Sequence, residues 1–171
     1  MGKLLEDAKV IAPFQPDSHD HGQCVSEAIA AAESCCEKHG LSFTPLRRQV
    51  LELVWSSHGP IGAYELLDKL RASRRKAEPP TVYRALDFLI EHGLIHRIES
   101  LNAYVGCGDP ARHHGGQFLI CSDCKSVAEL DDNAIARAVI RRADALGFDA
   151  QQQTIEVIGR CFDCSIERKD D

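Results

Sequence analysis

Residues 79–90 read PPTVYRALDFLI, and this stretch decides the fold expected for the first part of the chain. The two prolines suit the first turn of a helix, where a missing N–H leaves no hydrogen bond unmade. Behind them, Val82, Leu86 and Leu89 recur at helical spacing and form one apolar stripe. The stretch is therefore predicted to be a helix that buries this stripe and exposes a polar first turn.

The sequence on either side of this helix completes a recognisable order of elements. Thr44 followed by Pro45 is a helix start signal, and residues 63–70 carry a second apolar stripe. Beyond the helix, residues 95–99 and 103–107 are short extended pieces joined by a three-residue turn. Three helices followed by a hairpin is the order of a winged helix, whose third helix enters the major groove of DNA.

The polar side of residues 79–90 favours contact with nucleic acid. Tyr83 and Arg84 lie in the first turn, and an arginine there can bind guanine bidentately or hold a phosphate. The chain has a net charge of −6, yet residues 41–100 carry nine basic and seven acidic groups between acidic ends. Contacts with DNA phosphates need positively charged side chains nearby, but not a positive net charge of the whole chain. An ordinary exposed helix face would have the same residues, so both interpretations stay open at this point.

Two Cys-x-x-Cys pairs lie in the last third of the chain: Cys121 with Cys124, and Cys161 with Cys164. Four thiolates are the ligand set of a closed structural zinc site. The alternatives are two disulfides or two redox motifs. The first residues lack the apolar run of a signal peptide, and no run approaches the ~20 residues needed to span a bilayer. A cytoplasmic location is expected, where thiols prefer a metal to oxidation.

A second set of possible metal ligands comes from the hairpin, the segment after it and the first Cys pair's surroundings. It comprises His96, Cys107, His113, His114 and Glu129. Imidazole, thiolate and carboxylate together would make a mixed tetrahedral site suited to zinc. Such a metal would fix the angle between the two halves of the chain. For each residue alone, a surface histidine or a buried cysteine remains the alternative.

The start of the chain is less informative. Residues 1–24 have no clear periodicity, and within them His19, His21 and Cys24 form either a weak metal chelator or part of a disordered tail. Cys35 and Cys36 are adjacent and are expected to be free thiols.

Several motifs together resemble one known family. They are LSFTPLR (41–47), AYELLD (63–68), PPTVYRALDFL (79–89), ESLNAYV (99–105) and both Cys pairs. In these residues the chain resembles the ferric uptake regulator family, and within it the zinc uptake regulator branch. The resemblance covers the chain from about Cys36 to Cys164 and leaves only the first segment outside it.

This resemblance implies an α+β chain made of a winged-helix domain and an α/β dimerisation domain. The expected organisation is a mobile N-terminal arm (1–24), a winged-helix DNA-binding domain (25–107), a hinge linker (108–112) and a dimerisation domain (113–171). It further implies a homodimeric repressor of zinc-uptake genes that binds double-stranded operator DNA with an inverted repeat. Two Zn²⁺ ions per subunit are expected, and no membrane association.

The family's site residues fall on specific positions of this chain. The structural zinc ligands would be Cys121, Cys124, Cys161 and Cys164. The regulatory zinc ligands would be His96, Cys107, His114 and Glu129, with His114 chosen over His113. Tyr64 and Arg84 match DNA-contacting positions, and with Thr81 and Tyr83 they form the predicted DNA-binding set.

Other functions are weighed against this one. Iron and peroxide sensors of the family resemble each other in a His-x-His before the first Cys pair, where this chain has Gly116 and Phe118. A zinc hydrolase would need an open metal position and a general base, but four protein ligands close the second site. A Cys-x-x-Cys oxidoreductase would need a thioredoxin-like context that is not visible. The chain is therefore not expected to be an enzyme.

Overall fold

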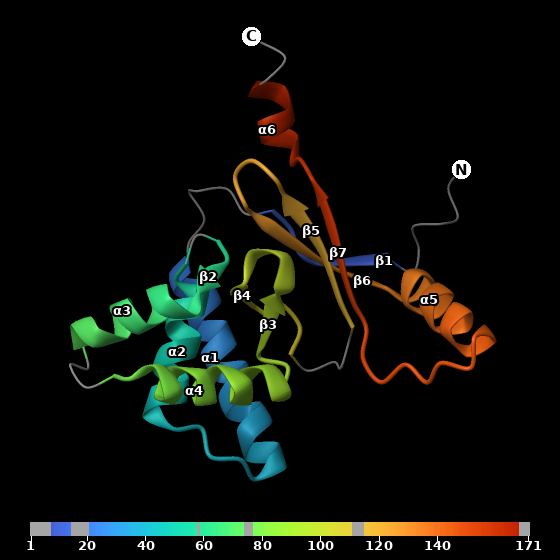
Figure 1. Ribbon diagram of the computed structural model, residues 1–171. Coiled ribbons are helices and arrows are strands. Elements are labelled where there is room, and N and C mark those ends of the chain that lie inside the picture. The colour runs from blue at the N-terminus through green and yellow to red at the C-terminus, as the bar shows by residue number, and fades with distance from the viewer. Residues whose placement is uncertain (1–7, 15–20, 58, 74–76, 111–114, 168–171) are drawn as a thin grey trace. The chain divides into compact units, whose positions relative to one another are not determined.

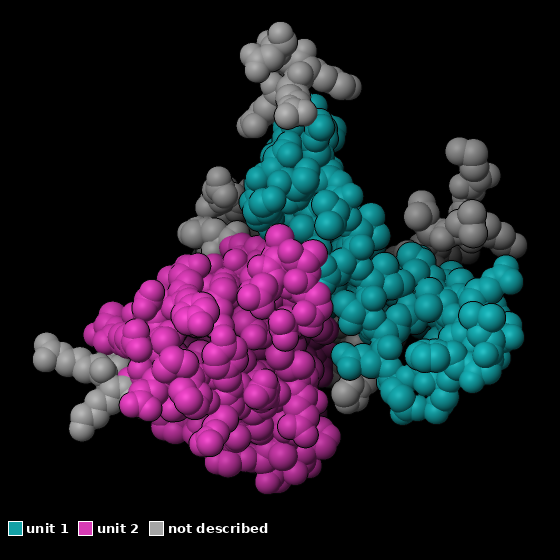
Figure 2. All heavy atoms as spheres, viewed as in Figure 1, with its two compact units in different colours: residues 1–15, 114–171 teal, residues 16–113 magenta. Residues whose placement is uncertain are grey.

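The computed structural model describes residues 8–14, 21–57, 59–73, 77–110 and 115–167. The chain divides into two compact units, which Figure 2 colours separately. Unit 1 comprises residues 1–15 and 114–171, and unit 2 comprises residues 16–113. Each unit has its own β-sheet, and both contain helices, so the α+β class is confirmed.

Figure 1 shows the helices of unit 2, and those that follow residue 44 lie close to their predicted positions. They are α1 (His21–His39), α2 (Pro45–Trp55), α3 (Ala63–Ser73) and α4 (Pro79–Glu91). The predicted start signal of α2 is confirmed, because the Thr44 hydroxyl accepts the Arg47 N–H at 3.4 Å and proline occupies the first turn. After α1, Gly40 has φ +64°, the left-handed conformation that glycine adopts at helix ends without strain.

The apolar stripe of α4 forms the core of unit 2. Val82, Leu86 and Leu89 have 1% or less of their surface exposed, and Val50 and Leu51 of α2 are buried in the same cluster. Burying each such side chain stabilises the fold by about 1.5–3 kcal/mol. The inner face therefore anchors α4 firmly, while its outer face stays available to solvent.

The sheet of unit 2 contains β2 (Ile61–Gly62), β3 (Ile95–Ile98) and β4 (Ala103–Gly106) in the order β2-β4-β3. The predicted hairpin is β3–β4, which pairs antiparallel with His96 opposite Val105. Its turn is a short 3-10 helix, η1 (Glu99–Leu101), followed by Asn102 in the left-handed region. Two residues are too few to show a strand pattern, so β2 was not predicted.

Unit 1 is a four-stranded sheet with a crossover helix. Its elements are β1 (Ala8–Ala12), β5 (Gly116–Cys121), β6 (Val127–Asp132), α5 (Asn133–Ala145), β7 (Thr154–Gly159) and α6 (Phe162–Glu167). The strand order is β1-β6-β5-β7, with β7 parallel to β5 and the other pairs antiparallel. The Asp132 carboxylate caps α5 by accepting the N–H groups of Ala134 at 2.7 Å and Ile135 at 3.3 Å.

The first segment differs from the expectation of a mobile arm over residues 1–24. Residues 8–12 form β1, which pairs with β6 and places Lys9 opposite Asp131. Helix α1 begins at His21, so Cys24 lies in a helix rather than in an arm. The pairing partner of β1 comes more than 100 residues later in the sequence, and no local pattern reveals such a partner.

The expected hinge at residues 108–112 precedes the division between the units, which falls after residue 113. Residues 111–114 lie outside the described part of the chain. Hinge motion and the exact domain boundaries therefore stay predictions. Among the described residues, no helix is long and apolar enough to cross a membrane.

Candidate metal centres and nucleic-acid interface

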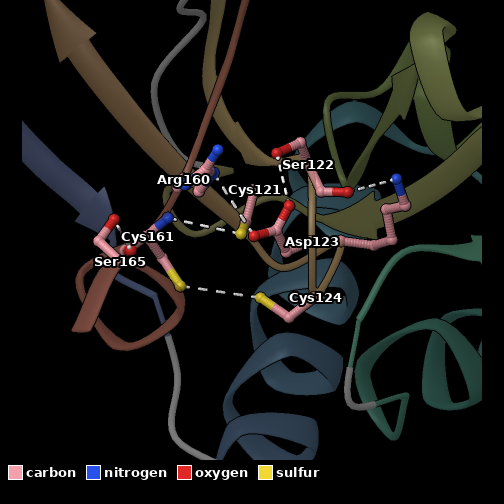
Figure 3. A network of polar contacts seen from close by, with 8 residues as sticks. Cys121, Ser122, Asp123, Cys124, Arg160, Cys161 and Ser165 are labelled. Atoms are coloured by element: carbon pink, nitrogen blue, oxygen red, sulfur yellow. Dashed lines mark hydrogen bonds and ion pairs between the residues drawn. The ribbon is translucent and has the colours of Figure 1, made fainter. Parts of the chain in front are cut away.

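The two Cys-x-x-Cys pairs meet in unit 1. The sulfur atoms of Cys121, Cys124, Cys161 and Cys164 all lie within 4.8 Å of one another. Those of Cys124 and Cys161 are 3.8 Å apart (Figure 3). Sulfurs bound at about 2.3 Å around one tetrahedral zinc are about 3.8 Å apart, whereas a disulfide needs about 2.05 Å. All four cysteines are free thiols, so their arrangement matches a chelate and not a disulfide pair.

The parallel pairing of β5 with β7 brings the two Cys pairs together. Cys121, the last residue of β5, lies opposite Gly159, the last residue of β7. The Ser122 N–H then donates to the Gly159 carbonyl at 2.7 Å and joins the two turns. The first turn is closed by the Lys125 N–H, which donates to the Cys121 carbonyl at 3.1 Å. Both chelating turns consequently leave the sheet at the same end.

Two further contacts link the turns, and the sequence analysis did not predict them. The Cys161 N–H donates to the Cys121 sulfur at 3.4 Å. The Arg160 guanidinium lies 3.5 Å from the Asp123 carboxylate (Figure 3). Both side chains of that ion pair are about two-fifths exposed, so it contributes little stability and mainly sets the geometry. Asp123 directly precedes Cys124, and Arg160 directly precedes Cys161. Opposite charges beside the two Cys pairs are the feature of the sequence from which this ion pair could have been predicted.

The electrostatics of these thiols suit a bound cation. Burial raises the pKa of the Cys121 thiol. Hydrogen bonds from backbone N–H groups, that of Cys161 above all, lower the pKa by more than burial raises it, so that it falls to about 6. The pKa of the Cys164 thiol is raised to about 12, mainly by the hydrogen bond of Cys164 with Cys161 and secondly by burial. The surroundings thus lower the pKa of Cys121 and raise the pKa of Cys161 and Cys164. A dication at the centre would attract all four thiolates, so this soft, closed donor set fits Zn²⁺.

Two ligands of the predicted regulatory site lie together in unit 2. His96 is on β3, and Cys107 directly follows β4. Because His96 pairs with Val105, side chains 96 and 107 lie on the same face of the hairpin, diagonal to each other. The His96 ring nitrogen and the Cys107 sulfur are within 4.8 Å. The Cys107 N–H donates to the Leu94 carbonyl at 3.2 Å. A nitrogen and a thiolate at this separation fit zinc.

The other predicted ligands belong to unit 1 or lie outside the described residues. Glu129 is on β6, opposite Phe118, and only 3% of it is exposed. A buried carboxylate needs a cation or hydrogen-bond donors. His113 and His114 lie outside the described residues. The grouping of His96 and Cys107 with His114 and Glu129 into one site therefore stays a prediction.

The predicted DNA-binding residues are on the surface of unit 2. Tyr64, in the first turn of α3, is 75% exposed, and Tyr83 of α4 is 41% exposed. Thr81 and Arg84 are also exposed on α4, and α3 packs against α4. Among the described residues, Arg84 has neither an ion-pair nor a hydrogen-bond partner. Its guanidinium is thus available to a phosphate or a base edge.

Comparison with known proteins decides the family. The model of the ferric uptake regulator family matches residues 38–158. The chain belongs to the ferric uptake regulator family. The resemblance seen in the motifs is thereby confirmed. Because this is a family of regulators, the hydrolase and oxidoreductase alternatives are set aside, and the chain is not an enzyme.

Several members of the ferric uptake regulator family are similar to the chain over most of its length. The zinc uptake regulation protein of Escherichia coli K12 is 41% identical over 140 residues, 81% of each chain. The zinc uptake regulation protein of Mycobacterium tuberculosis H37Rv is 32% identical over 128 residues, which cover 73% of this chain and 95% of that protein.

Solved structures of the ferric uptake regulator family agree with the fold. A zinc uptake regulator complexed with zinc and DNA has a TM-score of 0.81 and 38% identity, covering 86% of this chain and 98% of that chain. Holo XcZur has a TM-score of 0.76 and 45% identity, covering 82% and 98%. The Helicobacter pylori ferric uptake regulator, at 19% identity and a TM-score of 0.51, covers 82% and 93% and shares the fold alone.

Proposed function

We propose that this chain is a zinc-responsive transcriptional repressor that acts in the cytoplasm and represses genes of zinc uptake. The observation that carries the proposal is the 41% identity with the E. coli zinc uptake regulation protein, which extends over four-fifths of the chain. The assembled four-thiolate centre agrees with it, because it is suited to zinc. The repressor binds operator DNA with an inverted repeat as a zinc-loaded homodimer.

Each subunit holds two zinc ions with different roles. The four cysteines of unit 1 hold a structural zinc, because four thiolates close its coordination and leave no position for substrate. The regulatory zinc is bound by His96, Cys107, His114 and Glu129. Two of these residues belong to unit 2 and two to unit 1, so metal bonds join the units. Zinc then removes freedom at the hinge before DNA arrives, and the ordering cost of DNA binding falls.

The dimer is proposed to form through α5 and β7. Helix α5 has no buried side chain, and Ile135, Val139 and Ile140 are 40–44% exposed. On β7, an edge strand of the sheet, Val157 and Ile158 are 52% and 63% exposed. Apolar surface gathered on one helix and one free strand edge marks an interaction site. A second copy of the chain would cover both at once by two-fold symmetry.

Iron sensing is the alternative within the family, and the structure weighs against it. The two positions where a sensor of that kind carries histidines are Gly116 and Phe118 on β5. A Cβ placed on Gly116 would lie within 3.0 Å of two atoms of the Phe118 ring, so that ring occupies the space of a side chain at position 116. Without those imidazoles, a site rich in nitrogen and oxygen ligands is not built at β5.

Arg84→Ala is expected to weaken operator binding by about 1–3 kcal/mol if the guanidinium contacts a base edge. If Arg84 holds only a phosphate, affinity for operator and non-specific DNA should fall together. Both affinities are measured by fluorescence anisotropy with zinc present and at one stated salt concentration. Lys38→Ala is the control, because it removes one positive charge from an exposed position of α1 that is proposed neither for DNA contact nor for dimerisation. Unchanged affinity of Arg84→Ala for both DNAs would exclude α4 as the recognition helix.

Cys107→Ser and His96→Ala are each expected to lose only the regulatory zinc, because the two centres share no ligand. The variants should keep one zinc per chain and remain dimeric, whereas the wild type holds two. Metal content after dialysis and sedimentation velocity measure both properties. Cys35→Ser is the control, since it makes the same replacement at a free thiol of α1. If either variant lost both metals, the two sites would not be independent.

A further inference from the structure

Trp55, the one tryptophan of the chain, packs against Gly106, in the space that a side chain would occupy on any other residue. It is the last residue of α2, and its indole lies on Gly106 at the end of β4. A Cβ placed on Gly106 would lie closer than 3.0 Å to three atoms of the indole ring. Real Cβ atoms do not approach other atoms so closely, so the ring fills the position that any larger residue would need. Trp55 and Gly106 therefore form one packed pair between α2 and the hairpin.

This pair adjoins the backbone of Cys107. Gly106 immediately precedes Cys107, which is 3% exposed. The backbone of Cys107 is held on one side by its hydrogen bond to the Leu94 carbonyl, and Leu94 in turn donates to the Leu89 carbonyl of α4 at 2.8 Å. The contact of Trp55 with Gly106 supports the same backbone from the side of α2. Helix α2 also packs against α4, so both supports lead to the proposed recognition helix.

We propose that Trp55 is a positioning residue of the regulatory zinc site. Its indole, seated in the place of a side chain on Gly106, holds the Cys107 sulfur where it can share a metal with His96. The inference rests on the proposed function, because it requires a second zinc. Zinc accepts a sulfur at about 2.3 Å and a nitrogen at about 2.0–2.1 Å, with a tolerance of about 0.2 Å. Without the indole, the end of β4 loses this packing against α2, and a shift of the Cys107 sulfur beyond that tolerance would weaken metal binding.

Cobalt binding can test this role of Trp55 through two optical signals, the absorption of a cobalt–thiolate bond and the fluorescence of the tryptophan. Cobalt replaces zinc at tetrahedral sites, and a cobalt–thiolate bond gives a charge-transfer absorption band that an imidazole or a carboxylate does not. In the regulatory site this band reports the bond to Cys107 itself. The band also overlaps tryptophan emission, so cobalt bound to Cys107, the residue after the glycine that Trp55 contacts, should quench its fluorescence.

The experiment titrates Co²⁺ into the full-length dimer whose four-cysteine centre keeps its zinc, as checked by zinc content before and after. The wild type should bind one cobalt per chain with a thiolate band and quenched Trp55. Trp55→Ala should bind cobalt about 10–100-fold more weakly, the usual effect of losing an outer support, and with a weaker band per cobalt bound. Trp55→Phe should restore most of the affinity.

Two further variants separate positioning from stability. Gly106→Ala keeps the tryptophan but forces it off the strand, so it should weaken cobalt binding as Trp55→Ala does. Leu46→Ala removes a partly buried side chain nine residues earlier in α2 and should lower the melting temperature without changing cobalt affinity. Wild-type affinity and band in both Trp55→Ala and Gly106→Ala would overturn the inference. An equal loss of affinity in Leu46→Ala would also overturn it. A wild type that shows no second metal with a thiolate band would instead refute the proposed function.

Discussion

Cys161→Ser is expected to remove zinc from the four-cysteine centre and, with it, the folded dimer. Serine does not ionise to replace a thiolate near neutral pH, so three sulfurs remain at a site built for four. A structural zinc supplies on the order of 10 kcal/mol to a small module. Helix α5 does not replace this contribution within one subunit, because none of its side chains is buried. Cys121→Ser should have the same effect, because the sulfur of Cys121 also accepts a hydrogen bond from the Cys161 N–H.

Three measurements check this result: zinc content per chain, the melting temperature and the molecular mass by sedimentation. Cys35→Ser is the control, because its thiol is free and lies on α1 of unit 2. The control should keep both zinc ions and melt as the wild type does. A Cys161→Ser protein that stays dimeric with an unchanged melting temperature would show that the four-cysteine centre is not structural.

Zinc in the regulatory site is expected to tighten operator binding by about 5–150-fold, or about 1–3 kcal/mol, the usual size of such coupling. Without that zinc, the two units are joined by the proposed hinge at residues 108–112. Most hinge angles would then misplace the two α4 helices of a dimer for half-sites about 34 Å apart. In the proposed site, zinc bonds to residues of both units would remove this freedom. By linkage, operator DNA must tighten zinc by the same factor.

Calorimetric titrations test both directions of this coupling. Zinc is titrated with and without operator DNA, and DNA is titrated with and without regulatory zinc, at one salt concentration because phosphate contacts depend on salt. His96→Ala is the control, since its DNA affinity should not respond to zinc. Two couplings that agree and exceed about fivefold support the switch. An operator affinity that is the same with the regulatory site empty would mean that the protein is not a zinc-activated repressor.

Features that depend on near neighbours in the chain were predictable. Thr44 and Pro45 start α2, and the stripe of Val82, Leu86 and Leu89 makes α4, because capping and helical periodicity act within a few residues. Each Cys-x-x-Cys pair likewise shows a chelating turn in four residues. The family followed from such local motifs, above all from residues 79–89.

Features that depend on distant partners required the tertiary structure. The sequence contains the strands β5 and β7, but only their parallel register, with Cys121 opposite Gly159, places the second Cys pair beside the first. The pairing of β1 with β6 was missed for the same reason, and residues 8–12 were expected to be an arm. Trp55 and Gly106 lie about 50 residues apart, and neither residue alone suggests the other. Hydrogen bonds and packing between such segments form only when the whole chain has folded, so local sequence determines which elements and ligands exist, and tertiary contacts decide which of them meet.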